Sequence, residues 1–212
     1  MKKTILLMLF VAFATFSMAQ KWSLYIGGMA GYSAVTDKAA DSTGLKTIES
    51  DWSVSPEFGT FLSKTIQLGF VVGLDGSSGK TGDNKDYTSI SFCPTLYSRK
   101  FFNLTDNFSV FAGIYLSYIS GTYKLYSYPS DSQTETKLTR SGFGARLGIG
   151  IAYAFSPRFT AVAQYGLAGF SSIAYKNNDG NKTNTVTAFD VGVNTVGTGS
   201  VFNIGLYYTF KK

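Results

Sequence analysis

The amino-acid sequence predicts an all-β chain folded as an eight-stranded antiparallel up-and-down transmembrane β-barrel with short periplasmic turns and long extracellular loops. Three observations predict this fold. The closing segment Ser200–Phe210 alternates apolar residues with polar or small ones, as a barrel wall that faces lipid on one side requires. Short turns alternate with long polar connections, three against four. Aromatic residues make up 16% of the chain beside 23 Gly and only 4 Pro, which is typical of strands with close backbone contacts.

The N-terminus has the pattern of an export signal. The positive segment Met1–Lys3 precedes an apolar run from Ile5 to Phe16, and small residues up to Ala19 form a cleavage site. We expect residues 1–19 to be a signal peptide and residues 20–212 to form one outer-membrane β-barrel domain. The apolar run is shorter than the roughly 20 residues of a transmembrane helix. The expected location is the outer membrane of a Gram-negative bacterium.

Each expected strand is an alternating apolar run that ends at turn-forming residues. In chain order the strands are Trp22–Val35, Asp51–Leu62, Ile66–Asp75, Tyr87–Phe101, Phe108–Gly121, Thr139–Phe155, Phe159–Tyr175 and a closing strand that ends at Phe210. Tight turns that contain Ser, Asn, Asp or Pro join strands two to three, four to five and six to seven. The long polar connections are Thr36–Ser50, Gly76–Asp86, Thr122–Leu138 and Lys176–Asn184. The even strand number places both termini in the periplasm.

Two features of these strands require a local adjustment. Pro56 and Pro94 fall inside strands of a closed barrel, so we expect a bulge or a solvated backbone at each. The segment Phe189–Asn194 also alternates, ahead of the closing strand. Because a ninth strand would carry the C-terminus outside the cell, we expect this segment to extend the eighth strand above the membrane, with a break near Gly197–Gly199.

Alternation divides the strand residues into a lipid-facing set and a lumen-facing set. Charges in the central strand segments fall on the lumen side, because a lipid-facing charge costs about 2–4 kcal/mol at the bilayer midplane. A lone charge in a confined lumen is also costly, so we expect Glu57 and Arg146 to belong to one buried polar cluster. The candidate members are Glu57, Arg146, Arg99, Gln67 and Gln164. The alternative is that lumen water solvates each side chain separately.

Aromatic residues gather beside the turns and at the strand ends, where interfacial belts of membrane barrels lie. The candidate membrane-interface aromatics are Trp22, Trp52, Phe101, Phe102, Phe155, Phe159, Tyr208 and Phe210. The single cysteine, Cys93, lies in mid-strand and is interpreted as a small packing residue.

Two stretches connect this pattern with a known group of proteins. Pro56-Glu57-Phe58-Gly59 leads into a tight turn followed by Leu68-Gly69-Phe70, and the chain closes on Gly205-Leu206-Tyr207-Tyr208-Thr209-Phe210. The sequence resembles the small eight-stranded porin-family barrels, which include OmpX-like proteins and the barrel half of OmpA-like proteins. The resemblance covers essentially all of residues 20–212. It implies the fold and the outer-membrane location and says little about activity. Lys211 and Lys212 depart from the pattern, because such proteins usually end on the aromatic residue.

The residue types argue against an enzyme. Outer-membrane acyltransferases, phospholipases and proteases generally use a His as general base, and this chain contains none. One Cys without His does not make a transition-metal site. The segment Asp83-Asn84-Lys85-Asp86 lacks the spacing of a calcium loop. We therefore expect no catalysis, no catalytic or metal-binding residues and no cofactor.

Two non-enzymatic functions remain. The first is a role in surface structure or interaction through the extracellular loops, because an eight-stranded barrel has a lumen only wide enough for its own side chains. The alternative is a narrow conduit or small-ligand carrier across the outer membrane. The expected partners are outer-membrane lipid and lipopolysaccharide, the barrel-assembly machinery and an unidentified extracellular partner. Without Lys2 and Lys3 of the expected signal peptide, 17 basic residues face 13 acidic ones, so the mature net charge of about +4 is mild. We expect no nucleic-acid partner.

Overall fold

The computed structural model describes residues 23–38, 45–128, 133–177, 179–191 and 203–210. The expected signal peptide lies outside the described residues. Within them, no helix has the length and hydropathy needed to cross a bilayer. The strands are β1 (Ser23–Lys38), β2 (Lys46–Phe61), β3 (Ile66–Thr81), β4 (Asn84–Asn103), β5 (Phe108–Ser127), β6 (Thr134–Ala154), β7 (Phe159–Lys176), β8 (Lys182–Val191) and β9 (Asn203–Thr209).

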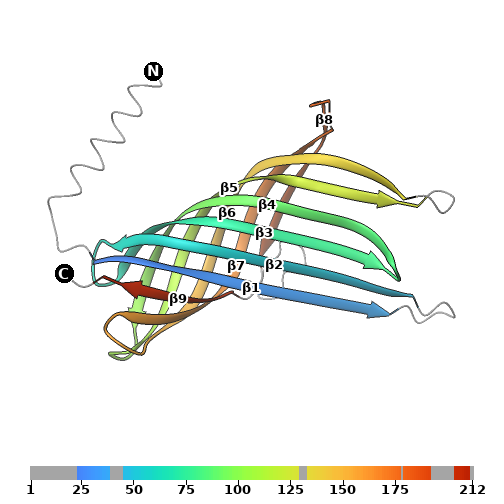
Figure 1. Ribbon diagram of the computed structural model, residues 1–212. Helices are drawn as coiled ribbons and strands as arrows, with labels where there is room; N and C mark the ends of the chain where they lie inside the picture. The colour runs from blue at the N-terminus through green and yellow to red at the C-terminus, as the bar shows by residue number, and fades with distance from the viewer. Residues whose placement is uncertain (1–22, 39–44, 129–132, 178, 192–202, 211–212) are drawn as a thin grey trace, which may run out of the picture.

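Eight strand positions close into a ring. Each strand from β1 to β7 pairs with the next one in antiparallel order, and β9 pairs with both β7 and β1. In Figure 1 the first strand (blue) lies beside the last (red), and the remaining strands curve around to meet them. The predicted antiparallel up-and-down barrel is therefore confirmed.

The barrel has two unlike ends. At the turn end, residues 62–65, 104–107 and 155–158 connect successive strands. The hydroxyl oxygens of Ser63, Thr105 and Ser156 each accept the backbone N–H groups two and three residues ahead. The same local bond therefore closes all three tight turns. β1 begins and β9 ends at this end, and the tips of the longer hairpins lie at the other, which we call the hairpin end (Figure 1).

The hairpins extend much further as paired strand than the sequence predicts. β3 and β4 continue through the expected loop and meet at a two-residue turn, in which Gly82 has a φ of 60°. β5 and β6 likewise pair as far as Ser127 and Thr134. Hydroxyl pairs support these extensions, such as Ser50 with Ser78 at 3.0 Å. Apolar residues no longer alternate regularly with polar ones in these extensions, whereas backbone pairing continues.

β8 and β9 share the eighth position of the ring. β8 pairs with the half of β7 nearer the hairpin end, and β9 pairs with the half nearer the turn end. The predicted extension of the eighth strand is confirmed as far as Val191. Its remaining residues and the expected break at Gly197–Gly199 lie outside the described part of the chain.

The two strand prolines interrupt the ladder without a bulge. β2 and β3 lack pairs at Ser55 and Pro56, and β4 and β5 lack pairs at Cys93 and Pro94, yet the register is the same on both sides of each gap. Of the two expected adjustments the bulge is therefore wrong, because a missing N–H removes pairs but adds no residue. A solvated backbone at Pro56 and Pro94 stays a prediction. The register shifts elsewhere: between Leu147 and Gly148 in the β6–β7 pair, and near the hairpin tips at Gly79/Lys80 and Tyr175/Lys176.

The lumen is filled at the turn end and emptier towards the hairpin end. Along β4 the inward residues begin with Phe101, Arg99 and Tyr97 and continue with Thr95 and Cys93. β5 shows the same decrease in size, from Phe111 and Tyr115 to Ser117. The buried core comprises Tyr25, Met29, Val71, Tyr97, Phe101, Phe111, Tyr115, Ala152, Val162 and Tyr207.

Candidate functional site

A fully buried arginine lies at the centre of the filled half. Arg99 projects inward from β4 and is 1% exposed, as is Glu57 from β2. The guanidinium donates from Nη1 to Glu57 Oε2 at 3.0 Å and from Nη2 to Glu57 Oε1 at 3.2 Å. This two-pronged ion pair supplies the charge compensation that a buried carboxylate and guanidinium both require.

Two glutamines and four tyrosines complete the group around this ion pair. Gln67 and Gln164 each accept a hydrogen bond from Arg99 at 3.2 Å. Tyr115 accepts from Arg99 Nε at 2.7 Å, and Tyr207 accepts from Nη1 at 2.6 Å. Tyr97 donates to Glu57 at 2.7 Å and also bonds Tyr25. We call these eight residues the plug: Tyr25, Glu57, Gln67, Tyr97, Arg99, Tyr115, Gln164 and Tyr207.

Gly69, directly paired with Tyr97 on the neighbouring strand, makes room for the tyrosine hydroxyls. A Cβ atom at Gly69 would lie 2.4 Å from the hydroxyl of Tyr25 and 2.5 Å from that of Tyr97. The Tyr97 hydroxyl can therefore reach Glu57, and the Tyr25 hydroxyl can reach Tyr97, only because this position lacks a side chain. A cation–π contact also holds Arg99 in place, because its guanidinium lies 4.1 Å from the centroid of the Tyr97 ring.

The structure brings together four of the five predicted lumen residues. Glu57, Arg99, Gln67 and Gln164 form the hydrogen-bonded group, whereas Arg146 is not part of it. The partner of Glu57 is Arg99 rather than Arg146. Arg146 lies beyond Tyr115, with its guanidinium 5.3 Å from the centroid of that ring. The plug tyrosines are absent from the predicted set, although strand parity places Tyr97 and Tyr115 inward.

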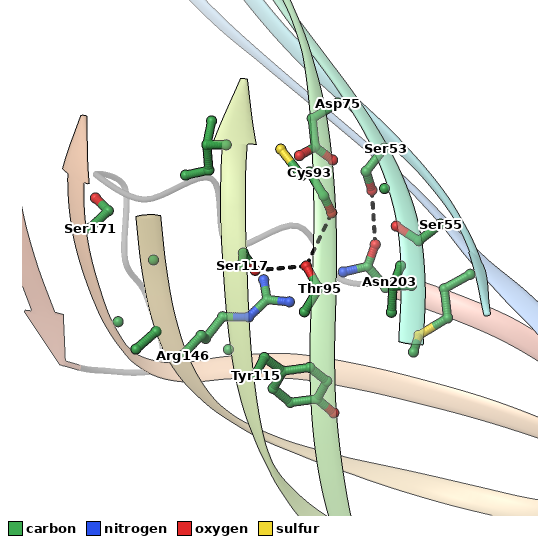
Figure 2. A pocket seen from close by; sticks show the side chains of 18 of the residues that line it. Ser53, Ser55, Asp75, Cys93, Thr95, Tyr115, Ser117, Arg146, Ser171 and Asn203 are labelled. Atoms are coloured by element: carbon green, nitrogen blue, oxygen red, sulfur yellow. Dashed lines mark hydrogen bonds between the residues drawn. The ribbon is translucent and has the colours of Figure 1, made fainter. Parts of the chain in front are cut away.

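A cavity of about 480 Å³ lies directly above the plug, on its hairpin side. We call this cavity the cup. Small inward residues leave the space, including Ser55, Gly73, Ser117 and Ser171. Figure 2 shows serine hydroxyls, Thr95 and Asn203 around the interior, with Arg146 extending towards the centre and Tyr115 below it. Thr95 donates to the backbone oxygen of Cys93 at 3.1 Å, and Ser53 donates to Asn203 at 3.0 Å.

The predicted interface aromatics within the described residues fall into three groups. Phe155, Phe159, Tyr208 and Phe210 form a continuous series of ring contacts at the turn end, with centroids 5.0–5.9 Å apart. Phe102 and Trp52 are exposed on the outer wall. Phe101 is wrongly placed by the prediction, because it points inward and packs against Phe61 and Phe111 below the plug. Trp22 lies outside the described residues.

Lysines face one another across all four hairpins. The cross-strand pairs are Lys38 with Lys46, Lys80 with Lys85, Lys124 with Lys137, and Lys176 with Lys182. Alternation along the strands places Lys38, Lys46, Lys124 and Lys137 on the outer face. Lys124 also forms an ion pair with Glu135 at 2.8 Å, in which both side chains are partly exposed. We call this set the lysine pairs.

Comparison with known proteins gives a family and several structures of low identity. The profile of the family described as "Outer membrane protein beta-barrel domain" matches residues 4–210. No curated protein matches the chain. Among solved structures, Neisserial surface protein A is 14% identical with a TM-score of 0.49, over 90% of this chain and 100% of that one. OprG from Pseudomonas aeruginosa is 17% identical (TM-score 0.45; 90% and 96%), and E. coli outer membrane protein W is 15% identical (TM-score 0.45; 91% and 100%).

Proposed function

The chain belongs to the outer membrane protein β-barrel domain family, and from that premise we propose that it acts in the structure of the cell surface, where its hairpins bind lipopolysaccharide. With short turns in the periplasm, as in bacterial barrels generally, the hairpin end faces outside. The observation that carries the proposal is the presence of a lysine pair on each of the four hairpins.

Electrostatics explains why these pairs favour an anionic partner. Like charges directly opposite one another in a sheet destabilise it. Repetition of this unfavourable arrangement on every hairpin is understandable if anionic groups lie between or beside the ammonium groups. Each lysine near an anionic membrane surface contributes about 1 kcal/mol to binding. The outer face of the barrel just above the lipid is where the phosphate groups of lipopolysaccharide are found.

The plug supports a surface role over a conduit. An open path would have to pass Arg99, which is fully enclosed by its hydrogen-bonded partners. Below it, Phe101 packs against both Phe61 and Phe111. The alternative of a narrow conduit therefore needs the buried network to open, whereas contacts through the hairpins leave it intact.

Lipopolysaccharide binding by the purified barrel tests the proposal. A quadruple variant, Lys38→Gln, Lys80→Gln, Lys137→Gln and Lys176→Gln, removes one lysine from each pair and keeps the Lys124–Glu135 ion pair. We expect its affinity for lipopolysaccharide to fall at least about 10-fold, since several charge contacts of about 1 kcal/mol are lost. Dephosphorylated lipopolysaccharide should bind the unmodified barrel equally weakly.

The matched control removes positive charge from the opposite end. A Lys64→Gln, Lys100→Gln barrel should keep its affinity within about twofold, because both residues lie beside the first turn. Cells that carry the quadruple variant should take up a hydrophobic dye as readily as cells in which the gene is deleted. Unchanged lipopolysaccharide affinity in a folded quadruple variant would refute the proposal.

A further inference from the structure

The cup is a cavity with a mixed polar and apolar lining, and its size suits a small molecule. Its volume of about 480 Å³ lies within the range of pockets that bind small molecules. Hydroxyl and amide side chains line part of it beside apolar residues such as Met29 and Ile119, and the plug closes it from below. A ligand entering from the hairpin end would therefore be held without passing through the barrel.

The cup has oppositely charged walls. Arg140 and Arg146 project into it from β6, whereas Asp51 and Asp75 line it from β2 and β3. In a ring of eight strand positions β2 lies opposite β6, so these two carboxylates lie across the lumen from the arginines. A third carboxylate, Asp190, lines the cup from β8. Figure 2 shows Arg146 reaching inward from one side and Asp75, next to Cys93, on the other.

Arg146 has unused capacity to bind an anion. Its Nε atom is buried and has no hydrogen-bond partner among the described residues. Arg140 differs, because its Nε donates to Ser91 at 2.7 Å. A buried guanidinium nitrogen without an acceptor is unfavourable, and a carboxylate is the group that pairs best with guanidinium geometry.

We propose that the cup binds a small zwitterion of amino-acid or dipeptide size, with its carboxylate on Arg146 and its ammonium group towards Asp75 and Asp51. The opposed charges of the two walls match the opposed charges of such a molecule, and they disfavour a dianion or dication. The surrounding hydroxyls of Ser55, Thr95 and Ser117 supply further hydrogen bonds. This inference is independent of the lipopolysaccharide contacts of the lysine pairs.

Three forms of one dipeptide test both ends of the ligand. Alanyl-alanine carries both charges, its N-acetyl form lacks the ammonium group, and its C-terminal amide lacks the carboxylate. Calorimetry or ligand-observed NMR with the purified full-length barrel should detect alanyl-alanine with a Kd below about 1 mM. Each blocked form should bind at least about 10-fold more weakly. Failure of the folded barrel to bind alanyl-alanine, or equal binding of either blocked form, would overturn the proposal.

Variants locate the site. Arg146→Gln should weaken alanyl-alanine binding at least about 10-fold and Asp75→Asn about threefold or more, whereas Lys64→Gln at the turn end should leave it unchanged. Lipopolysaccharide binding by the same Arg146→Gln preparation should stay intact, which shows that the barrel is folded and separates the two proposals. Unchanged dipeptide binding by Arg146→Gln would refute the assigned position.

Discussion

Arg99 is the residue on which the order of the lower lumen depends. It donates hydrogen bonds to two glutamines, two tyrosines and one carboxylate. Because the guanidinium is desolvated, its free energy depends on keeping those acceptors, above all the charged one. The plug therefore behaves as a unit, in which removal of one member leaves buried polar atoms without partners.

Substitution of Glu57 tests this interdependence. Glu57→Gln leaves the Arg99 charge buried and uncompensated, so the free energy of unfolding should fall by about 3–5 kcal/mol. The Glu57→Gln, Arg99→Gln double variant should lose less than the sum of the two single variants, because the pair interacts directly. Urea unfolding followed by tryptophan fluorescence measures both quantities. Glu49→Gln, on the exposed part of β2, is the control. Strict additivity would contradict the ion pair.

Arg146 provides the opposite case. It is half-buried and outside the hydrogen-bonded plug, so Arg146→Gln should change the free energy of unfolding by less than about 1 kcal/mol. A loss as large as that of Glu57→Gln would show that Arg146, as the sequence suggests, is the true partner of Glu57. The same unfolding measurement therefore decides whether Arg99 or Arg146 is the partner of Glu57.

Gly69 tests the space that the tyrosine hydroxyls need. A methyl group there would displace Tyr25 and Tyr97 from their positions around Glu57. We expect Gly69→Ala to lower the free energy of unfolding by about 1–3 kcal/mol, the usual cost of overpacking. Gly144→Ala is the matched control, because its nearest neighbour would be 3.4 Å away. Equal effects of the two substitutions would contradict the packing described for Gly69.

Strand parity predicts the plug only in part. It places Glu57, Arg99, Gln67 and Gln164 inward, because side chains alternate and lipid excludes charge. It does not choose between Arg99 and Arg146 as the partner of Glu57, since that choice depends on how far each strand is displaced along its neighbours. Phe101 could have been assigned correctly, because it lies two residues beyond Arg99 and must share its side of the wall.

At the scale of the elements, hydropathy predicts where strands cross the lipid and not where they end. The core strand segments are predicted within a few residues at the turn end, where polar turn residues coincide with the end of pairing. At the hairpin end, β3 continues six residues beyond Asp75, through residues of low apolar content. Above the lipid, backbone pairing alone sustains a strand, and it leaves no periodic signal in the sequence.

Labelling of single cysteines tests the orientation of these elements. In a Cys93→Ser background, cysteines at Asp83 and Asp179 should react with an impermeant reagent on intact cells. Both residues lie at hairpin tips. Cysteines at Lys64 and Asp106 should react only after lysis, because they lie in the short turns. Labelling of a cysteine at position 64 or 106 in intact cells would show that the barrel has the opposite orientation.

At the scale of the whole molecule, the barrel combines a half closed by the plug, the cup above it and the lysine pairs at the hairpin end. The closed half follows from large inward side chains and the cup from small ones on the same strands. Lipid determines the outer surface between the two ends. A binding role at the surface is compatible with all three parts, and a through-channel is compatible only with the cup.

Single-channel recording in planar lipid bilayers tests the closed barrel most directly. The purified, folded protein should insert without producing conductance steps, because the Arg99 plug and the phenylalanines beneath it fill the lumen. A larger open porin prepared in the same detergent serves as the positive control for insertion detection. Reproducible conductance steps from the unmodified barrel would contradict the plug and favour the conduit.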